Sequence, residues 1–324
     1  MKLGHDMLFL SDADIAAANV SPRALADSVD AMLKAKAAGT TVTKPKLGIY
    51  PKPGTFFQAM AGALSDPAYA GVKWTGVIHD NDKRGLPHVS PLILLNDVAT
   101  GLPLALMDGQ WITTHRTAAL TLVGARYLAR PDSSSIGFVA CGVQARSHLL
   151  TFREHFPLKR AIAYSRRRET AEAFAAEVRQ TGMPIEVVSD PRKAVEGMDI
   201  VISSVPESPN LVPFIDPAWF SPGSYAGLLD VSRGVMWDKA FAFDVLATDD
   251  HEQSQSMVKS GRLKYPKPFD TDLADLAGAR KKGRTTATQR TGLVFSGLAL
   301  ADVAVAGAIY QGALKAGRGQ VLPL

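Results

Sequence analysis

The sequence predicts an α/β protein with a doubly wound parallel sheet and a second, discontinuous α+β domain. From residue 135 to 249, short apolar segments alternate with helical segments, which is typical of parallel strands joined by helices. Before residue 108 the pattern differs, because a helical segment is followed by short apolar runs between prolines and glycines. The two patterns indicate two domains of different construction.

The composition is that of an ordinary globular protein, with 324 residues, 46% hydrophobic and 21% charged. Cys141 is the single cysteine, which excludes an internal disulfide framework and fits a reducing, cytoplasmic compartment. The first residues lack the apolar core of a signal peptide, and Asp302 interrupts the apolar stretch 293–310, so we expect no membrane segment. The net charge of +5 suits an anionic ligand, but without a nucleic-acid-binding motif we expect no nucleic-acid partner.

The first domain is expected to begin with a strand over 6–10, with Ser11 as the cap of a following helix. Residues 21–39 predict a helix, with Ser21 at the N-cap, Pro22 at the first helical position and Gly39 at its end. Residues 41–107 then hold apolar runs and turn residues typical of antiparallel strands, which we assign to a substrate-side sheet.

Helical character resumes at Thr113, with threonines placed to cap the start of the helix. The segments that follow predict strands at 135–141, 160–165, 185–189, 199–205, 224–230 and 243–249, and helices from 143, over 168–180 and near 191–196. A final alanine-rich helix over 291–316 is expected to return to the first domain. The predicted domains are 1–115 with 291–324 for substrate binding and dimerisation, and 116–290 for a dinucleotide.

Residues 137–145, GFVACGVQA, resemble the glycine-rich turn that holds the pyrophosphate of a dinucleotide in a Rossmann-type fold. The three small positions of the motif are Ala140, Gly142 and Ala145, so one expected glycine is replaced by alanine. Ala140 fits only if its φ stays negative. The alternative is an ordinary strand-to-helix turn built from small residues.

The next strand ends in Ser165, followed by Arg166, Arg167 and Arg168. An NAD site usually carries an acidic residue here for the ribose 2′-hydroxyl, whereas a hydroxyl and guanidinium groups suit a 2′-phosphate. We therefore expect NADP(H), with Arg166 as the first contact and NAD(H) as a possible substitute. The alternative is a solvated basic start of a helix.

Five segments together resemble the ornithine cyclodeaminase/mu-crystallin family: MDGQWITTHRTAAL, YLARP, IGFVACGVQA, YSRRRETAEAFA and AVEGMDIVISSVPESP. The resemblance covers nearly the whole chain. It implies a homodimer in which each chain has a Rossmann domain and a discontinuous substrate and dimerisation domain. Members of this family include cyclodeaminases, L-amino-acid dehydrogenases, cyclic ketimine reductases and a thyroid-hormone-binding crystallin.

The resemblance implies a group of side chains around a substrate carboxylate. Arg116 falls where the family's arginine binds that carboxylate, and Lys73 matches the active-site lysine that exchanges protons with the substrate nitrogen. Lys46 replaces a second carboxylate-binding arginine of many relatives, and Met60 matches a pocket methionine that could equally be core. From the residues alone, an arginine in the first turn of a helix needs a nearby anion, and Lys73 in an apolar strand is functional or reaches an edge.

The segment PGSYAGLLDVSRG departs from the cyclodeaminase pattern, which places a catalytic aspartate here. A gapless match puts Ser232 at that position, and the base is then absent. A shift of the match by two residues makes Asp230 the base. Because side chains alternate along a strand, residues two positions apart face the same side, so the pattern does not distinguish the two matches. The choice between Asp230 and Ser232 stays open.

The cofactor contacts are expected in the helix that follows Thr113, in the turn, at the end of the next strand and at the ends of two later strands. They are Arg116, Thr117, Ala140, Cys141, Gly142, Val143, Gln144, Ser165, Arg166, Arg167, Ser204, Val205 and Leu229. His79, His88 and His115 show no metal-ligand spacing, so no metal is expected.

The leading hypothesis is an NADPH-dependent imine reductase, equivalently an L-amino-acid dehydrogenase, acting on a small substrate with a carboxylate. Lys73 would keep the substrate nitrogen protonated, because an iminium accepts hydride more readily than a neutral imine. The alternatives are an ornithine-type cyclodeaminase that releases ammonia with a tightly held nicotinamide cofactor, and a non-catalytic NADPH-gated binding protein.

Overall fold

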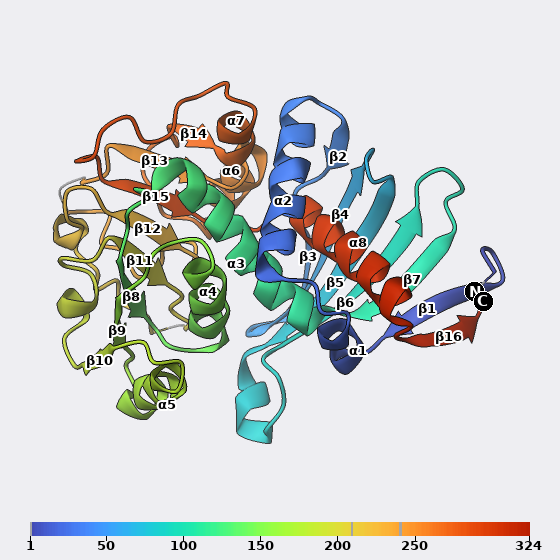
Figure 1. Ribbon diagram of the computed structural model, residues 1–324, viewed down its shortest axis with the longest axis horizontal. Coiled ribbons are helices and arrows are strands. Elements are labelled where there is room, and N and C mark those ends of the chain that lie inside the picture. The colour runs from blue at the N-terminus through green and yellow to red at the C-terminus, as the bar shows by residue number, and fades with distance from the viewer. Residues whose placement is uncertain (1, 209, 240–241) are drawn as a thin grey trace. The chain divides into compact units, whose positions relative to one another are not determined.

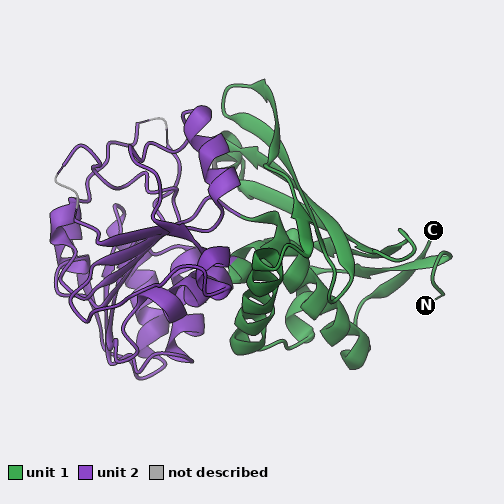
Figure 2. Ribbon diagram, turned by 90° about the horizontal axis from the view of Figure 1, so that it is seen from above, with its two compact units in different colours: residues 1–116, 298–324 green, residues 117–297 purple. Residues whose placement is uncertain are grey.

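The computed structural model describes residues 2–208, 210–239 and 242–324. The chain divides into two compact units, Met1–Arg116 with Leu298–Leu324, and Thr117–Gly297 (Figure 2). The helix α3 (Gly109–Leu128) contributes residues to both units. Each unit has its own sheet.

The strands of unit 1 form one mixed sheet in the order β16-β1-β7-β6-β5-β4-β2, with β3 also paired to β4. The pairs from β4 to β7 are antiparallel, as the sequence pattern predicts. The strands are β1 (Asp6–Leu10), β2 (Thr41–Thr43), β3 (Leu47–Lys52), β4 (Thr55–Leu64), β5 (Tyr69–Ile78), β6 (Val89–Asp97), β7 (Pro103–Asp108) and β16 (Gln320–Pro323).

One face of this sheet is covered by α8 (Ala299–Ala316), drawn in red in Figure 1. Glycines allow the helix to approach the strands closely. A Cβ at Gly62 would lie 2.9 Å from Leu300, and one at Gly307 would lie 2.6 Å from the ring of Tyr69. This close packing fixes which face of α8 meets β4 and β5. The helices α1 (Asp12–Ala17) and α2 (Pro22–Ala37) pack against α8.

Unit 2 holds an all-parallel sheet in the order β10-β9-β8-β11-β12-β15-β13-β14. Numbered from β8, its first five strands have the order 3-2-1-4-5 of a doubly wound dinucleotide-binding fold, which confirms the predicted fold class. The strands are β8 (Ser135–Val139), β9 (Arg160–Tyr164), β10 (Ile185–Val188), β11 (Ile200–Ser203), β12 (Tyr225–Leu228), β13 (Val245–Thr248), β14 (Thr271–Asp272) and β15 (Thr291–Val294). The helices include α4 (Val143–Arg153), α5 (Arg168–Arg179), α6 (His251–Lys259) and α7 (Leu273–Ala277).

Two sequence-based helix boundaries are wrong. Residues 291–294 form β15, so the last helix begins at Ala299 and not near 291. The helix expected from Thr113 begins at Gly109, and the Thr114 hydroxyl donates to the Gln110 carbonyl within the helix instead of capping it. The helix starts predicted at Ser11 and Ser21 are confirmed, since both hydroxyls accept from backbone N–H groups of the first turn.

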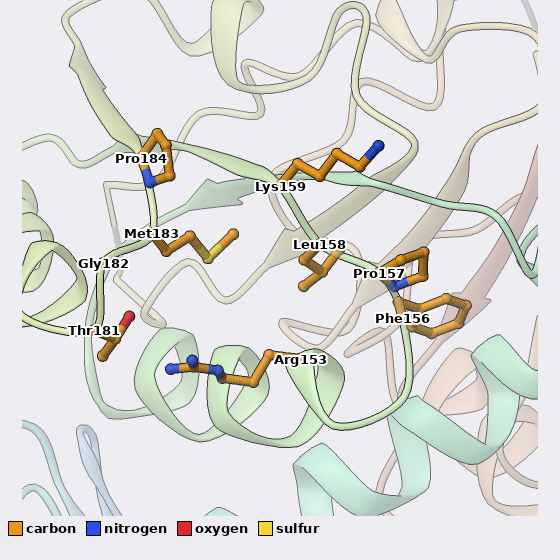
Figure 3. A pocket seen from close by; sticks show the side chains of 9 residues that line it. All are labelled: Arg153, Phe156, Pro157, Leu158, Lys159, Thr181, Gly182, Met183 and Pro184. Carbon is orange, nitrogen blue, oxygen red and sulfur yellow. The ribbon is translucent and has the colours of Figure 1, made fainter.

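A surface hollow in unit 2 lies beside the amino ends of β9 and β10 (Figure 3). It is lined by Arg153, Phe156, Pro157, Leu158, Lys159, Thr181, Gly182, Met183 and Pro184. Ligands of doubly wound sheets bind at the carboxyl ends of the strands, where the order reverses. The hollow therefore lies at the opposite end of the sheet from the predicted dinucleotide site.

Gly137 in β8 carries a tight contact, because a Cβ there would lie 1.8 Å from the carbonyl oxygen of Ala194. We expect Gly137→Ala to lower the free energy of unfolding by about 3 kcal/mol or more, since backbone must move to admit the methyl group. Urea unfolding followed by circular dichroism measures this. The control is Gly142→Ala, where a Cβ meets nothing within 4 Å. Equal stability of the two variants would contradict the packing described.

Candidate active site

Lys73 lies on β5 with its side chain on the face of the sheet that α8 covers. In the strand ladder it pairs with Met60 of β4 and Ile93 of β6, and all three are buried. Lys73 is only 3% exposed, and a buried ammonium requires a partner. That partner is Asp302, because the Lys73 Nζ donates to Asp302 Oδ1 at 2.7 Å.

Arg116 meets the same carboxylate oxygen. Its Nε lies 3.0 Å from Asp302 Oδ1, and both residues are buried. Arg116 lies in the interior of α3, so the expectation of an arginine in the first turn of the helix is wrong. The argument that the helix dipole there requires a nearby anion therefore does not apply. The three side chains Lys73, Arg116 and Asp302 carry formal charges that sum to +1. This group, called the buried triad below, brings two cationic side chains to one carboxylate oxygen.

The buried triad lowers the pKa of Lys73. Burial is the main cause, the positive charge of Arg116 adds to it, and Asp302 opposes both. The resulting pKa is about 8, compared with 10.5 for an ordinary lysine. The amine can therefore change its protonation state near neutral pH, which suits proton exchange with a substrate nitrogen.

In the sequence, Asp302 interrupts an apolar stretch, and no role in the site is predicted for it. The signal was present, because Asp302 is the single charged residue between 293 and 310. An acid in an otherwise apolar helix that is buried must have a cationic partner. The hydrogen-bonded partner, Lys73, lies 229 positions away in sequence, so no local pattern identifies it.

Two further predicted residues lie in the same part of unit 1. Met60 is 4% exposed and adjoins Lys73 in the ladder. Lys46 directly precedes β3. Because Leu47 of β3 pairs with Ala59 of β4, the antiparallel register continues from this pair to Lys46 and Met60. Unit 1 therefore brings Lys73, Met60 and Arg116 together, with Lys46 next to them along β3.

The glycine-rich turn of unit 2 shows one departure from expectation. Ala140 has φ +73°, so the condition of a negative φ is wrong and the alanine adopts the left-handed conformation that favours glycine. Its backbone N–H donates to the Tyr164 carbonyl at 2.8 Å, and Ser204 Oγ donates to its carbonyl oxygen at 3.3 Å. These bonds hold the strained residue between the carboxyl ends of β8, β9 and β11.

The start of α4 fits a dinucleotide phosphate. Gly142 is its N-cap, no side chain caps the first turn, and a Cβ on Gly142 would meet open space. The first N–H groups of the helix are thus not capped by a side chain, and the backbone is accessible to an anion. Val143 and Gln144 form the first helical turn, and the buried Gln144 Oε1 has no hydrogen-bond partner among the described residues.

Cys141 and Ser165 tie the turn to the next strand. The Cys141 N–H donates to Ser165 Oγ at 2.9 Å, and the thiol is buried. Burial raises the pKa of Cys141 to about 11, so the thiol stays protonated and contributes through its backbone. The Ser165 hydroxyl keeps a proton to donate to a ribose or phosphate oxygen.

The three arginines after Ser165 differ in their surroundings. Arg168 pairs with Glu172 at 3.0 Å. Arg166 and Arg167 are exposed, and within the described parts of the chain neither makes an ion pair. Two unpaired guanidinium groups thus lie where the ribose of a dinucleotide is held in this fold.

Asp230 lies just beyond the carboxyl end of β12, where its Oδ2 accepts from Ser203 Oγ at 2.7 Å and from the Val205 N–H at 3.1 Å. Asp230 Oδ1 has no hydrogen-bond partner among residues 2–208, 210–239 and 242–324. Burial raises the pKa of Asp230 to about 6, against the effect of the Ser203 hydrogen bond. Asp230 is therefore a buried carboxylate with one unused oxygen.

Ser232 has a different role in the structure. Its Oγ accepts from the Trp237 indole N–H at 3.0 Å, and both Val231 and Ser232 have φ near +55°. The remaining predicted contacts, Ser204, Val205 and Leu229, follow the ends of β11 and β12, and the Leu229 N–H donates to the Ser203 carbonyl. Thr117 is buried in α3, where its carbonyl accepts from Thr121.

The described residues contain no cluster of three or more histidine, cysteine, aspartate or glutamate side chains that could hold a metal ion. None of their helices combines the length and the apolar character that crossing a membrane requires.

Known proteins resemble this chain over nearly its whole length. Alanine dehydrogenase of Archaeoglobus fulgidus is 28% identical over 297 residues, which are 89% of this chain and 90% of that protein. The structure of Thermococcus litoralis Δ1-pyrroline-2-carboxylate reductase in complex with NADH and L-proline is 29% identical, with a TM-score of 0.87 over 97% of this chain and 99% of that chain. An archaeal alanine dehydrogenase dimer with bound NAD is 26% identical, with a TM-score of 0.86 over 98% and 99% of the two chains.

The sequence pattern of one family spans both units. The family model matches residues 5–317, which include the buried triad, the glycine-rich turn and the segment around Asp230. The chain belongs to the ornithine cyclodeaminase/mu-crystallin family.

Proposed function

We propose that the chain reduces a small imine that carries a carboxylate, with NADPH as the preferred donor, and catalyses the reverse oxidation of the corresponding L-amino acid. The observation that carries this proposal is the buried triad, in which a lysine of lowered pKa and an arginine lie beside one buried carboxylate oxygen. Two of the relatives with named activities support the same chemistry, an alanine dehydrogenase and a pyrroline-carboxylate reductase.

Each residue of the triad has a part in this reaction. Arg116 pairs with the substrate carboxylate and fixes the position of the adjacent C=N bond. Lys73 donates a proton to the imine nitrogen, which makes the carbon a better hydride acceptor. A bound nicotinamide supplies the hydride. In the reverse direction, neutral Lys73 takes a proton from the substrate nitrogen.

The cofactor residues proposed are those of the turn and the neighbouring strand ends in unit 2. The uncapped start of α4 at Gly142 suits the pyrophosphate. Ser165 and the unpaired Arg166 and Arg167 favour a 2′-phosphate, because a carboxylate that would repel it is missing from this strand end. NADP(H) is thus the proposed cofactor, although relatives are described with NADH and NAD.

A cyclodeaminase is the second candidate, and Asp230 is the observation that favours it. This buried carboxylate has a raised pKa and an unused oxygen, as a base that activates water or an amine would need. Ammonia release without net change in nicotinamide absorbance would identify this reaction. A non-catalytic NADPH-gated binding protein, the third possibility, would keep its ligand binding when Lys73 is replaced.

We also propose a homodimer formed through the uncovered face of the unit 1 sheet. Leu47, Trp74 and Leu92 are exposed, and the register Leu47–Ala59–Trp74–Leu92 places them in one row across four strands. Such a contiguous apolar surface is typical of an interface, and a relative of known structure is a dimer. Sedimentation velocity is expected to give about twice the chain mass of 34.6 kDa, and Trp74→Glu is expected to give the single chain. A monomeric wild type would contradict this proposal.

The pH dependence of the reaction follows from Lys73. Reduction needs the protonated amine, so kcat/KM is expected to fall as pH rises through about 8, whereas oxidation needs the neutral amine and rises through the same pH. Lys73→Met is expected to lower kcat about 10²–10⁴-fold in both directions, the usual contribution of a general acid or base. NADPH absorbance measures both. Parallel pH profiles for the two directions would contradict the role of Lys73.

The affinities for NADPH and NADH distinguish the role of the turn from the role of the arginines. Gly142→Ala is expected to weaken both NADPH and NADH about tenfold or more by placing a methyl group in the phosphate path, with unchanged stability of the free protein. Arg166→Ala is expected to weaken NADPH about 10–100-fold and leave NADH unchanged, because only NADPH has the 2′-phosphate. Calorimetric titration measures these affinities. Arg168→Ala is the matched control, since Arg168 pairs with Glu172; equal effects of the two arginine variants on NADPH would argue against the assignment.

A further inference from the structure

Asp302 is the one acidic residue of α8, and it lies where this helix crosses the sheet of unit 1. It is 1% exposed, so its charge is removed from water almost completely. Burying a carboxylate costs free energy that only close cationic partners offset. Lys73 and Arg116 are these partners, one from β5 and one from α3.

The way in which Asp302 meets its partners is unusual for a structural ion pair. A single oxygen, Oδ1, contacts both Lys73 Nζ at 2.7 Å and Arg116 Nε at 3.0 Å. The second oxygen, Oδ2, is buried and has no hydrogen-bond partner in the described ranges. A carboxylate serving stability alone is expected to use both oxygens, because an unpaired buried acceptor is costly. The shared oxygen instead brings two cations to one point.

The packing of α8 against the sheet fixes the position of Asp302. Small residues on the strands let α8 approach closely, with Leu300 against Gly62 and Val303 against Gly71 on either side of Asp302. A helix packed in this way cannot turn or slide without steric overlap. The carboxylate is thus held rigidly beside Lys73.

We propose that Asp302 is a positioning residue of the reductase: it keeps the Lys73 amine charged and beside Arg116, so that proton donor and carboxylate anchor act on the same small molecule. This inference rests on the proposed function. It assigns Asp302 no contact with substrate, and its effect passes through Lys73 and Arg116.

The surroundings of Lys73 explain why the charge of Asp302 matters. Met60 and Ile93, its neighbours across the ladder, are apolar. Among the described residues, the charged groups that face it are Arg116 from α3 and Asp302 from α8, and Lys46, which directly precedes β3, is nearby in register. Burial and Arg116 both lower the pKa of Lys73, whereas Asp302 alone raises it. Removing the charge of Asp302 therefore favours the neutral amine.

The test uses Asp302→Asn, which keeps the shape and one acceptor oxygen while removing the charge. With Δ1-pyrroline-2-carboxylate and NADPH as substrates, the alkaline limb of kcat/KM is expected to shift from about 8 to lower pH. The expected shift is about 1–3 pH units, the effect of an opposite charge at this distance. Activity lost at pH 8 should therefore return as pH is lowered. A loss of the same factor at every pH would mean a structural role and overturn the proposal. Glu196→Gln, in the exposed pair with Arg192, is the matched control and is expected to leave the profile unchanged.

A second measurement needs neither activity nor cofactor. NMR titration of protein labelled with ¹³C at lysine Cε, with the Lys73 signal assigned through Lys73→Arg, is expected to show a midpoint near 8 in the wild type. The midpoint should fall in Asp302→Asn. A wild-type midpoint below about 7 would overturn the proposal even if the variant did not fold, because Asp302 would then not keep the amine charged at neutral pH.

The two readouts separate this inference from the proposed function. Imine reduction by the wild type with an unchanged Lys73 midpoint in Asp302→Asn overturns the role of Asp302 and leaves the reductase intact. The expected NMR shift without reduction of any carboxylated imine supports the control of Lys73 by Asp302 and overturns the proposed reaction.

Discussion

The functional arrangement of unit 1 depends on one buried carboxylate shared by two cations. Lys73 and Arg116 come from a strand and a helix far apart in sequence, and a nitrogen of each lies within 3.0 Å of Asp302 Oδ1. Two like charges placed together in a dry interior repel each other and lose their hydration. Asp302 makes their proximity tolerable, yet the sum of charges stays positive. A site of this kind is suited to a small anion that carries a nitrogen.

Unit 2 carries the turn that is proposed to hold the cofactor phosphate, and this turn depends on backbone conformation. The parallel strands bring the ends of β8 and β11 together at the point where the strand order reverses. There Ala140 is held in a left-handed conformation and Gly142 leaves the start of α4 open. The strain at Ala140 is balanced by two hydrogen bonds, one that its N–H donates to the Tyr164 carbonyl of β9 and one that its carbonyl accepts from Ser204 Oγ. The turn thus keeps the geometry of the glycine-rich motif without its first glycine.

Local sequence patterns were sufficient for the class of the fold and for most elements. Alternating apolar strands and helices predict the parallel sheet, and Ser21 with Pro22 predicts a helix start that the structure confirms. The family resemblance supplied Lys73 and Arg116, which the structure brings together. Their chemical roles stay proposals.

What the sequence did not reveal depends on contacts between distant segments. Asp302 is an isolated acid in an apolar helix until the fold places it against Lys73. The φ of Ala140 is set by bonds to Tyr164 and Ser204 and not by its own preference. The strand at 291–294 reads as part of an apolar helix, because a fully buried parallel strand and a buried helix have the same composition.

The central claim, that the buried triad anchors a carboxylate beside a reducible C=N bond, is tested most directly by comparing two cyclic imines. Δ1-Pyrroline-2-carboxylate and 1-pyrroline share the ring and differ in the carboxylate. With Δ1-pyrroline-2-carboxylate, we expect oxidation of one NADPH for each amino acid formed. With 1-pyrroline, we expect kcat/KM to be lower by a factor of about 100 or more, because a charged hydrogen-bonded pair is lost. Equal kcat/KM values for the two imines would contradict it.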